Sequence, residues 1–200
     1  IVIDGLLEVL PDGFGFLRSP VSEFAPSVED TYVSPSQIRR FNLRTGDWVQ
    51  GEARLPRDNE RYLALLRISL VNNNHPENEK GRLLFESMSV ANGGSQLSIS
   101  ETCVKDWQDW SSMNPLSTGE SLILSIDGNV SVADLLVDWG AQLNADVLLA
   151  FIEGQEEEML RLRRKGAQLF FSKMGETPGR HQQLIDLVEH KARRLAEKGK

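Results

Sequence analysis

Five short strand-like runs, each bounded by turn-forming residues, fill the first 75 residues of the chain. The runs are Gly5–Leu10, Phe14–Arg18, Thr31–Ser34, Trp48–Arg54 and Tyr62–Val71. Pro11-Asp12-Gly13 separates the first two, and clusters of these residue types favour tight turns. Ser36–Phe41 is expected to form a short helical turn. Five short strands in so few residues are typical of a small closed barrel, which the sequence therefore predicts.

The pattern changes in the second part of the chain, where apolar strands alternate with helical spacing. The expected strands are Ser121–Ile126, Asp146–Ile152 and Gln168–Phe171, and the expected helices are Val130–Leu143, Gln155–Lys165 and Arg180–Lys198. This alternation predicts a parallel α/β sheet. The segment Asn72–Asn78 is polar, contains a proline and reads as a linker. We therefore expect domains at residues 1–75 and 114–200, joined by a connecting segment at 76–113.

Charge and cysteine usage exclude several classes of protein. A net charge of −7 and a pI near 5.1 argue against the binding of duplex nucleic acid. They argue less strongly against the binding of single strands, because base stacking supplies much of that affinity. Cys103 is the only cysteine, so a disulfide framework within the chain is excluded and an intracellular location is favoured. No run of about 18 apolar residues is present, so we expect no membrane span.

The start of the sequence does not resemble a secretory signal peptide. The chain starts Ile-Val-Ile-Asp, without a methionine and without a charged segment before an apolar run. A secretory signal peptide has both a basic start and an apolar core, so none is expected here. We interpret the chain as a fragment of a longer protein.

The segment from Asp12 to Arg18 carries the most chemistry. Alternate residues of a strand share a face, so Phe14, Phe16 and Arg18 are expected to point the same way. Two rings beside an arginine suit the stacking of unpaired bases, worth ~1–3 kcal/mol per base, with a phosphate or cation–π contact from the arginine. The alternative is that both rings face the barrel interior. Gly13 and Gly15 argue against it, because strand glycines often allow close approach by a ligand or another backbone.

Three segments together resemble the cold-shock-like RNA-binding domain of the Rho family of transcription terminators. They are Gly5–Arg18, Asp30–Asp47 and Glu60–Leu66, and the similarity covers about residues 5–86. The resemblance implies an OB-fold or cold-shock-like barrel. It also implies that this barrel is the primary site for single-stranded RNA, with a preference for pyrimidines and notably for cytosine.

The resemblance also implies which residues contact RNA. The matching positions are Leu10, Asp12, Phe14, Phe16, Arg18, Tyr32, Glu60 and Tyr62. Tyr62 would form the aromatic side of a base pocket, and the carboxylates would accept a hydrogen bond from the exocyclic amine of cytosine. Arg39, Arg40 and Arg44 are candidates for contacts with the RNA backbone, although each is equally a solvated charge or a structural ion pair.

From Asn114 onward the chain resembles, more faintly, the start of the RecA-like motor domain of the same family, a fold of the P-loop NTPase type. A phosphate loop needs a glycine-rich turn, a lysine and a hydroxyl. Aligned with that loop are Asp127, Gly128 and Asn129, followed by Val132 in the lysine place and Ala133 in the hydroxyl place. No lysine occurs between residues 105 and 165, so no local shift of the alignment restores the motif.

The acidic catalytic motif of that family is also missing. Glu153-Gly154-Gln155 stands where the family has Asp-Glu-Arg, so the general base and its arginine are lost. We therefore predict a partial, degenerate RecA-like domain without catalytic or metal-ligating residues. No cofactor is expected; ATP with Mg²⁺ would bind only if the motor is functional after all. The sequence leaves open whether the chain is an enzyme. The loss of the phosphate-loop and catalytic residues favours a protein without enzymatic activity.

The sequence is compatible with three functions. The first is a Rho-like protein that binds pyrimidine-rich single-stranded RNA, in a role in transcription termination. The second is an ATP-dependent RNA translocase or helicase in full-length form, and the third is a protein-interaction scaffold whose barrel no longer binds RNA. The resemblance adds a Rho-like homo- or hetero-oligomer, hexameric in the family, and an RNA polymerase complex as partners. It implies a cytoplasmic location and no membrane partner.

Overall fold

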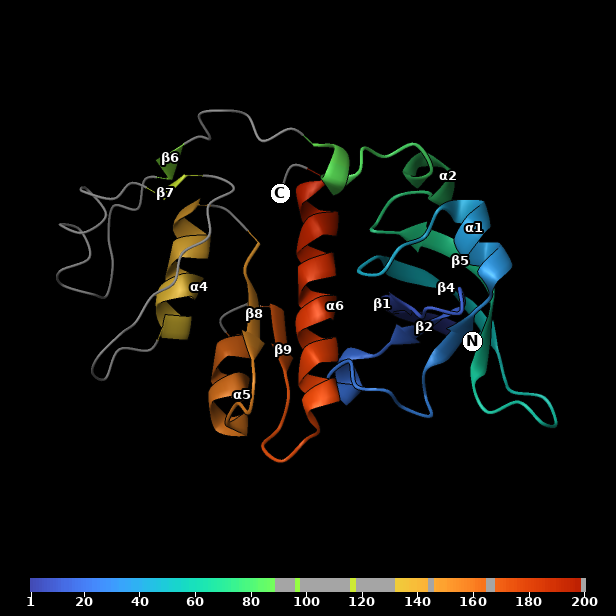
Figure 1. Cartoon of the computed structure of the whole chain (residues 1–200), viewed down its shortest axis with the longest axis horizontal. Coiled ribbons are helices and arrows are strands. Elements are labelled where there is room, and N and C mark those ends of the chain that lie inside the picture. Colours follow the sequence, from blue (N-terminus) through green and yellow to red (C-terminus); the bar gives the residue numbers. More distant parts are fainter. Residues whose placement is uncertain (89–95, 98–115, 118–131, 144–145, 165–167, 199–200) are drawn as a thin grey trace. The chain divides into compact units, whose positions relative to one another are not determined.

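The computed structural model describes residues 1–88, 96–97, 116–117, 132–143, 146–164 and 168–198. The chain divides into two compact units. The helices and strands of the described residues are labelled in Figure 1. One comprises Ile1–Glu86, Ala150–Gly154 and Phe170–Gly199; the other comprises Ser87–Leu149, Gln155–Leu169 and Lys200. This division joins the last helix of the chain to the barrel. The domain boundaries expected from the sequence stay a prediction.

The N-terminal barrel is built from five strands. They are β1 (Val2–Val9), β2 (Gly15–Arg18), β3 (Thr31–Val33), β4 (Trp48–Arg54) and β5 (Leu63–Val71). The strand order is β1-β2-β3-β5-β4, and β4 pairs back with β1 to close the barrel. All pairs are antiparallel except β3 with β5. The closed five-stranded barrel that the sequence predicts is confirmed, with strand ends that shift by a few residues.

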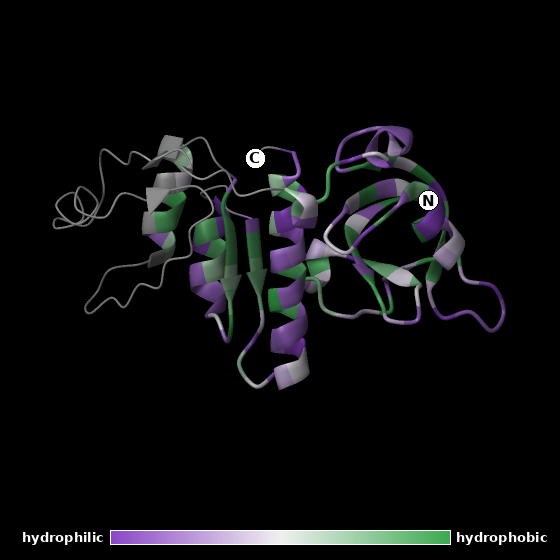
Figure 2. Cartoon of the chain, turned by 45° about the horizontal axis from the view of Figure 1, so that its top comes forward, coloured by the Kyte–Doolittle hydropathy of each residue, from purple (hydrophilic) through white to green (hydrophobic). Residues whose placement is uncertain are grey.

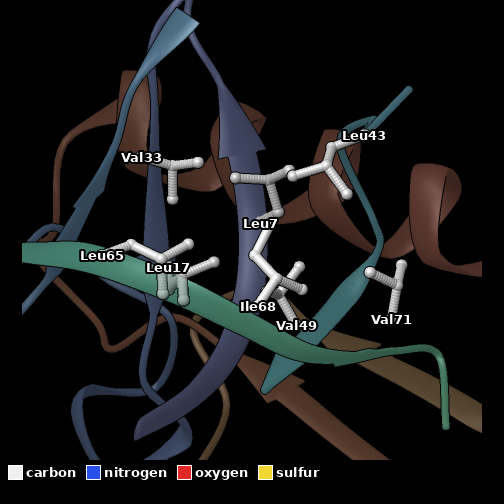
Figure 3. Close-up of a cluster of buried hydrophobic side chains, with 8 residues drawn as sticks. All are labelled: Leu7, Leu17, Val33, Leu43, Val49, Leu65, Ile68 and Val71. Carbon is white, nitrogen blue, oxygen red and sulfur yellow. The ribbon is translucent and has the colours of Figure 1, made fainter. Parts of the chain in front are cut away.

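A cluster of eight buried aliphatic side chains fills the barrel (Figure 3). The cluster consists of Leu7, Leu17, Val33, Leu43, Val49, Leu65, Ile68 and Val71. Strand alternation turns one side of each strand inward, which is why Leu7 and Leu17, paired across β1 and β2, both enter this core. Full burial of a side chain of this kind contributes about 1.5–3 kcal/mol. The aromatic rings of the first 75 residues are not members of the cluster.

Strand β5 departs from simple alternation. Its buried residues Leu65, Ile68 and Val71 are spaced by three, because the register with β4 shifts between Gln50 and Gly51 and again between Glu52 and Ala53. Each shift inserts an extra residue on β5, and such bulges re-aim a side chain. One of them turns Leu66 outward, where 60% of the residue is exposed.

Gly15 permits close packing of β2 on β1. A Cβ atom at this position would lie 2.7 Å from the carbonyl oxygen of Glu8 and 2.9 Å from the side chain of Leu7. A strand glycine allows close approach either by a ligand or by another backbone. At Gly15 the approach is by another backbone. Gly15 is buried and pairs with Val9 of the neighbouring strand.

Short helices lie between the barrel strands or follow the last of them. They are the 3-10 turns Pro20–Ser22 and Phe85–Ser87 and the α-helices α1 (Pro35–Phe41) and α2 (Pro76–Glu79). Helix α1 begins with a capping box, in which Ser34 and Gln37 satisfy each other's backbone N–H groups. Helix α2 occupies the end of the segment that the sequence predicts to be a linker. Pro76 and Glu79 of α2 are buried, and the linker assignment of the segment stays a prediction.

The remaining described chain begins with two short strands that the sequence does not predict, β6 (Gln96–Leu97) and β7 (Leu116–Ser117). The elements after them follow the predicted alternation: α4 (Val132–Leu143), β8 (Leu148–Phe151), α5 (Glu156–Arg164), β9 (Gln168–Phe171) and α6 (Pro178–Ala196). The N–H of Gln168 donates to Val147 and that of Ser172 to Phe151, so the pairing of β8 and β9 advances in the same direction along both strands. This parallel pair confirms the predicted α/β character there. The predicted strand Ser121–Ile126 lies outside the described residues.

Helix α6 has one polar and one buried face, visible as alternating colours in Figure 2. Thr177 caps its first turn, Pro178 occupies the first helical position, and Leu184 and Leu187 are fully or almost fully buried. Gly46, in the loop before β4, has a φ of +91° and lies directly against the helix: a Cβ atom there would be 2.5 Å from the carbonyl of His190. The loop therefore packs on the backbone of α6.

Two further contacts join the barrel to the C-terminal segment of the same unit. The ring of Phe24, in the loop after β2, stacks on that of Phe170 in β9 with centroids 4.6 Å apart. The guanidinium of Arg180 donates to the carbonyl of Glu23, whose φ of +52° is unusual for a non-glycine residue. In the part of the chain that the structure describes, no helix has the length and apolar character needed to cross a membrane.

Candidate nucleic-acid interface

Four aromatic side chains form a continuous group on the outside of the barrel, which we call the ring cluster: Phe14, Phe16, Tyr32 and Tyr62. Centroid distances are 5.8 Å for Phe14 and Phe16, 5.6 Å for Phe14 and Tyr32, and 4.8 Å for Phe16 and Tyr62. All four are half-buried and none belongs to the barrel core. The alternative that Phe14 and Phe16 face the interior is therefore wrong, and the prediction of a shared outer face is confirmed.

Strand register explains how the ring cluster forms. Phe16 pairs with Glu8 on one side and with Tyr32 on the other, and Tyr32 pairs with Ala64. Directly paired residues project from the same face of a sheet, so these four side chains form a row across β1, β2, β3 and β5. The small side chain of Ala64 at the end of the row leaves space beside Tyr32.

That space is a pocket of about 590 Å³, which we call the base pocket. Its lining consists of Tyr32, Ser34, Ser36, Gln37, Arg54, Glu60, Arg61, Tyr62, Ala64, Leu65 and Leu66. Three of the predicted contact residues therefore meet at one pocket, although Tyr32 is far in the sequence from Glu60 and Tyr62. The pocket offers ring faces together with a carboxylate.

Glu60 is fixed in its ionised form. Arg54 donates two hydrogen bonds to its carboxylate, one of them 2.7 Å long, and the backbone N–H of Arg57 donates a third at 3.0 Å. The hydrogen bonds from Arg54, followed by that from Arg57, lower the pKa of Glu60 to about 2. The sequence interpretation missed Arg54, which lies on β4 and has no local signal linking it to Glu60.

Arg18 lies beside the ring cluster but is not free. Its guanidinium carbon is 5.1 Å from the centroid of Phe16, as the shared-face prediction requires. The side chain is only 7% exposed, its Nε donates to Glu8 at 2.6 Å, and one terminal nitrogen donates to Asp30. We call these three residues the Arg18 cluster. The structure therefore corrects the expectation that Arg18 is available for a phosphate: its charge is neutralised within the barrel and supports Phe16.

Asp30 is a second residue that the sequence interpretation did not select. Its side chain is fully buried, and its Oδ2 atom accepts hydrogen bonds from Arg18 and from the N–H of Ser27. Its other oxygen, Oδ1, has no hydrogen-bond partner among the described residues. A buried carboxylate oxygen without a partner is unfavourable, and the burial of Oδ1 closes it to a ligand.

A second pocket of about 440 Å³, the side pocket, adjoins the base pocket. It shares Ser36, Gln37 and Leu66 with the base pocket, and its own lining consists of Arg40, Phe41, Arg67, Ile68, His75 and Pro76. The guanidinium of Arg40 lies 5.1 Å from the ring centroid of Phe41. The shared residues make the two pockets one continuous surface with positive charge on the side-pocket end.

The other predicted contact residues lie at separate places. Leu10 is half-buried and Asp12 exposed at the turn between β1 and β2, where the N–H of Leu10 donates to Phe14. Arg39 is exposed on α1. Arg44 lies in the loop that packs on α6 and forms a 3.9 Å ion pair with Glu86. This contact favours a structural ion pair over a contact with the RNA backbone.

The predicted phosphate loop is only partly described. Val132 and Ala133 begin α4, and Ala133 is buried. Asp127, Gly128 and Asn129 lie outside the described residues. At the other end of this region, Glu153 follows β8 with a φ of +58°, and its carboxylate lies 3.8 Å from His181 of α6.

Comparison with known proteins agrees with this site. Residues 3–77 match the family model described as the RNA-binding domain of the Rho termination factor. The chain is 34% identical to the transcription termination factor Rho of Neisseria gonorrhoeae and 36% identical to that of Escherichia coli K12. These alignments cover 96% and 97% of the present chain. The alignments cover 48% and 49% of those proteins, so the chain spans about half the length of the curated relatives it matches.

Proposed function

Because the chain belongs to the Rho family, we propose that its barrel binds single-stranded, pyrimidine-rich RNA on the ring cluster and in the base pocket. The observation that carries the proposal is a group of four half-buried rings, two of which, Tyr32 and Tyr62, line one pocket together with an ionised carboxylate. Bases stack on ring faces without regard to sequence, which supplies affinity. The carboxylate adds a requirement for a hydrogen-bond donor.

Cytosine satisfies that requirement. Its exocyclic amine donates hydrogen bonds, whereas uracil presents a carbonyl oxygen at the same position. The Glu60 carboxylate only accepts, and its low pKa keeps it ionised at neutral pH. A hydrogen bond from the cytosine amine to Glu60 therefore supports a preference for cytosine over uracil.

The side pocket extends the proposed RNA path. Arg40 and Arg67 line it, and it is continuous with the base pocket through Ser36, Gln37 and Leu66. A strand whose base occupies the base pocket would place a neighbouring phosphate near these guanidinium groups. Exposed Arg39 lies on the same helix as Arg40 and would add to the local positive charge.

The role of the parent protein follows from family membership and is proposed on that ground. We assign it to transcription termination, as a Rho-like homo- or hetero-oligomer that acts on an RNA polymerase complex in the cytoplasm. The second half would be a partial RecA-like domain that no longer hydrolyses ATP. Support for this comes from Val132 and Ala133 in the places of the phosphate-loop lysine and hydroxyl, and from the parallel β8–β9 pair.

RNA binding is tested by fluorescence anisotropy of labelled oligo-C, oligo-U and oligo-A at two salt concentrations. The wild type is expected to bind oligo-C most tightly, and the double variant Phe14→Ala/Phe16→Ala to lose that preference. Each phosphate contact should contribute about −0.7 to the slope of log affinity against log salt. No binding by the wild type at low salt would contradict the proposal and favour a scaffold role.

The proposed loss of the motor is tested separately with a fluorescent ATP analogue and Mg²⁺. The expected result is no saturable binding at millimolar nucleotide, because a terminal phosphate meets neither a lysine nor a hydroxyl. Saturable binding that requires Mg²⁺ would contradict the proposal that the RecA-like domain has lost its nucleotide site. It would support an RNA translocase in the full-length protein.

A further inference from the structure

We propose that Gln183 of α6 is a positioning residue for the RNA-binding face, acting on Phe16 through Glu8 and Arg18. The inference rests on the proposed function, because it concerns the affinity of that same face. The inference goes beyond the proposed function because it makes Gln183, a residue of the last helix, one of the residues that determine RNA affinity. The barrel and α6 belong to one compact unit, so the contacts involved are internal to it.

A continuous series of contacts links the helix to the ring. The Nε2 atom of Gln183 donates to Oε2 of Glu8 at 2.8 Å, and the Nε atom of Arg18 donates to the same oxygen at 2.6 Å. The guanidinium carbon of Arg18 in turn lies 5.1 Å from the centroid of the Phe16 ring. One carboxylate oxygen is therefore the junction between α6 and the support of the ring cluster.

An amide side chain suits the position of residue 183. On the other side of Gln183, a terminal nitrogen of Arg180 donates to Oε1 at 2.9 Å. A guanidinium can only donate and a carboxylate can only accept, so the side chain between them must offer an acceptor and a donor. Arg180 itself is held by the carbonyl of Glu23 in the loop after β2. The orientation of the Gln183 amide is thus set by both neighbours.

Charge balance in the Arg18 cluster explains why this hydrogen bond matters. Two carboxylates, Glu8 and Asp30, share one guanidinium, and their side chains are 15% and 0% exposed. Among the described residues, Asp30 already has an oxygen without a partner. Removing the Gln183 donor leaves a second under-satisfied carboxylate competing for Arg18, and buried unsatisfied acceptors are strongly unfavourable. Arg18 would then shift between its partners and leave its position over Phe16.

The proposal is tested on the whole chain with oligo-C anisotropy. Gln183→Ala is expected to weaken oligo-C binding on the order of tenfold, the lower end of the effect of a hydrogen bond to a charged group. Gln183→Glu, which places a carboxylate against Glu8, should weaken it further. The matched control is Gln182→Ala, since Gln182 is exposed and bonds to Asp186 within α6. The control should bind as the wild type does.

A reciprocal exchange separates positioning from general damage. In the double variant Glu8→Gln/Gln183→Glu, the new amide at position 8 can accept from Arg18 and donate to the new carboxylate, which Arg180 then pairs with. Oligo-C affinity should recover toward the wild-type value relative to Gln183→Glu alone. Failure of the exchange to recover affinity, with both variants folded by thermal melting, would overturn the proposal.

A measurement without RNA keeps this inference apart from the proposed function. The NMR signal of the Arg18 Nε–H group should shift in Gln183→Ala and stay in place in Gln182→Ala. An unchanged Arg18 signal overturns the inference even if the wild type binds RNA. A wild type that does not bind oligo-C contradicts the proposed function, and a shifted Arg18 signal then still establishes that Gln183 positions Arg18.

Discussion

The rings of Phe16 and Tyr62 meet edge to face with centroids 4.8 Å apart, although Phe16 lies in β2 and Tyr62 precedes β5. The contact joins the aromatic strand to the base pocket, because Tyr62 lines that pocket beside Glu60. Edge-to-face pairs add about 0.5–1.5 kcal/mol beyond their area burial. Each ring therefore holds the other in place before a base stacks on either of them.

Alanine at either ring should weaken oligo-C binding by about 1–3 kcal/mol, the usual loss for a stacked base. The double variant Phe16→Ala/Tyr62→Ala should lose less than the sum of the two single changes, because residues in contact are not independent. Anisotropy titrations measure all three. Phe85→Ala is the control, since that exposed ring is outside the ring cluster. Strictly additive losses would contradict a shared platform.

Arg54→Ala should raise the pKa of Glu60 from about 2 toward its ordinary value of 4.5, because the hydrogen bonds from Arg54 are the largest cause of its depression. In the wild type the carboxylate is ionised above pH 2 to 3. In the variant it becomes protonated as the pH falls through about 4 to 5. Titration of the Glu60 side-chain carbon by NMR measures the change.

The matching control for this titration is Arg61→Ala. Arg61 lines the base pocket and lies 5.7 Å from the ring centroid of Tyr62, but it is not among the groups that shift Glu60. The pKa of Glu60 should stay near 2 in that variant. An equal rise in both variants would show that the general charge of the pocket, and not the hydrogen bonds of Arg54, keeps Glu60 ionised.

Neighbouring leucines of β5 should respond in opposite ways to truncation. Leu65→Ala removes a core side chain that is 6% exposed and should lower the free energy of unfolding by about 2–5 kcal/mol. Leu66→Ala, at the bulge, should change it by no more than about 0.5 kcal/mol. Urea denaturation of both variants gives the comparison. Equal losses would mean that the bulge does not turn Leu66 outward.

Gly46→Ala should destabilise the chain by more than about 1 kcal/mol. The added methyl would meet the backbone of His190, and the φ of +91° is unfavourable for alanine. Gly81→Ala is the matched control, since a Cβ atom there has no neighbour within 4 Å. Thermal and urea unfolding compare the two. A variant at Gly46 as stable as that at Gly81 would show that α6 does not pack on this loop.

Several sequence predictions rested on local signals, and those signals were sufficient for them. The strand Trp48–Arg54 and the strand Gln168–Phe171 have the predicted limits, because apolar alternation or an apolar run ends at clear turn residues. The common face of Phe14 and Phe16 follows from the two-residue period of a strand. Helix α6 begins two residues earlier than predicted because Pro178 is accepted in a first turn capped by Thr177.

Other features depend on contacts between distant segments. Burial of Arg18 follows from Glu8 and Asp30, and nothing in the sequence around Arg18 distinguishes a paired guanidinium from a free one. The outward turn of Leu66 comes from register shifts against β4, which strand periodicity alone does not reveal. The short helix α2 was missed because its four residues read as a polar, proline-containing linker.

The sequence by itself determined the barrel, its aromatic strand and the alternation of strands and helices that follows, because each of these is written in residues adjacent along the chain. Tertiary structure decided which polar groups are neutralised and which remain open. It joined Glu60 to Arg54, Arg18 to Glu8, and Gln183 to the support of Phe16. The physical reason is that hydrogen bonds and ion pairs form between whichever groups folding brings within about 3 Å, whatever their separation in sequence.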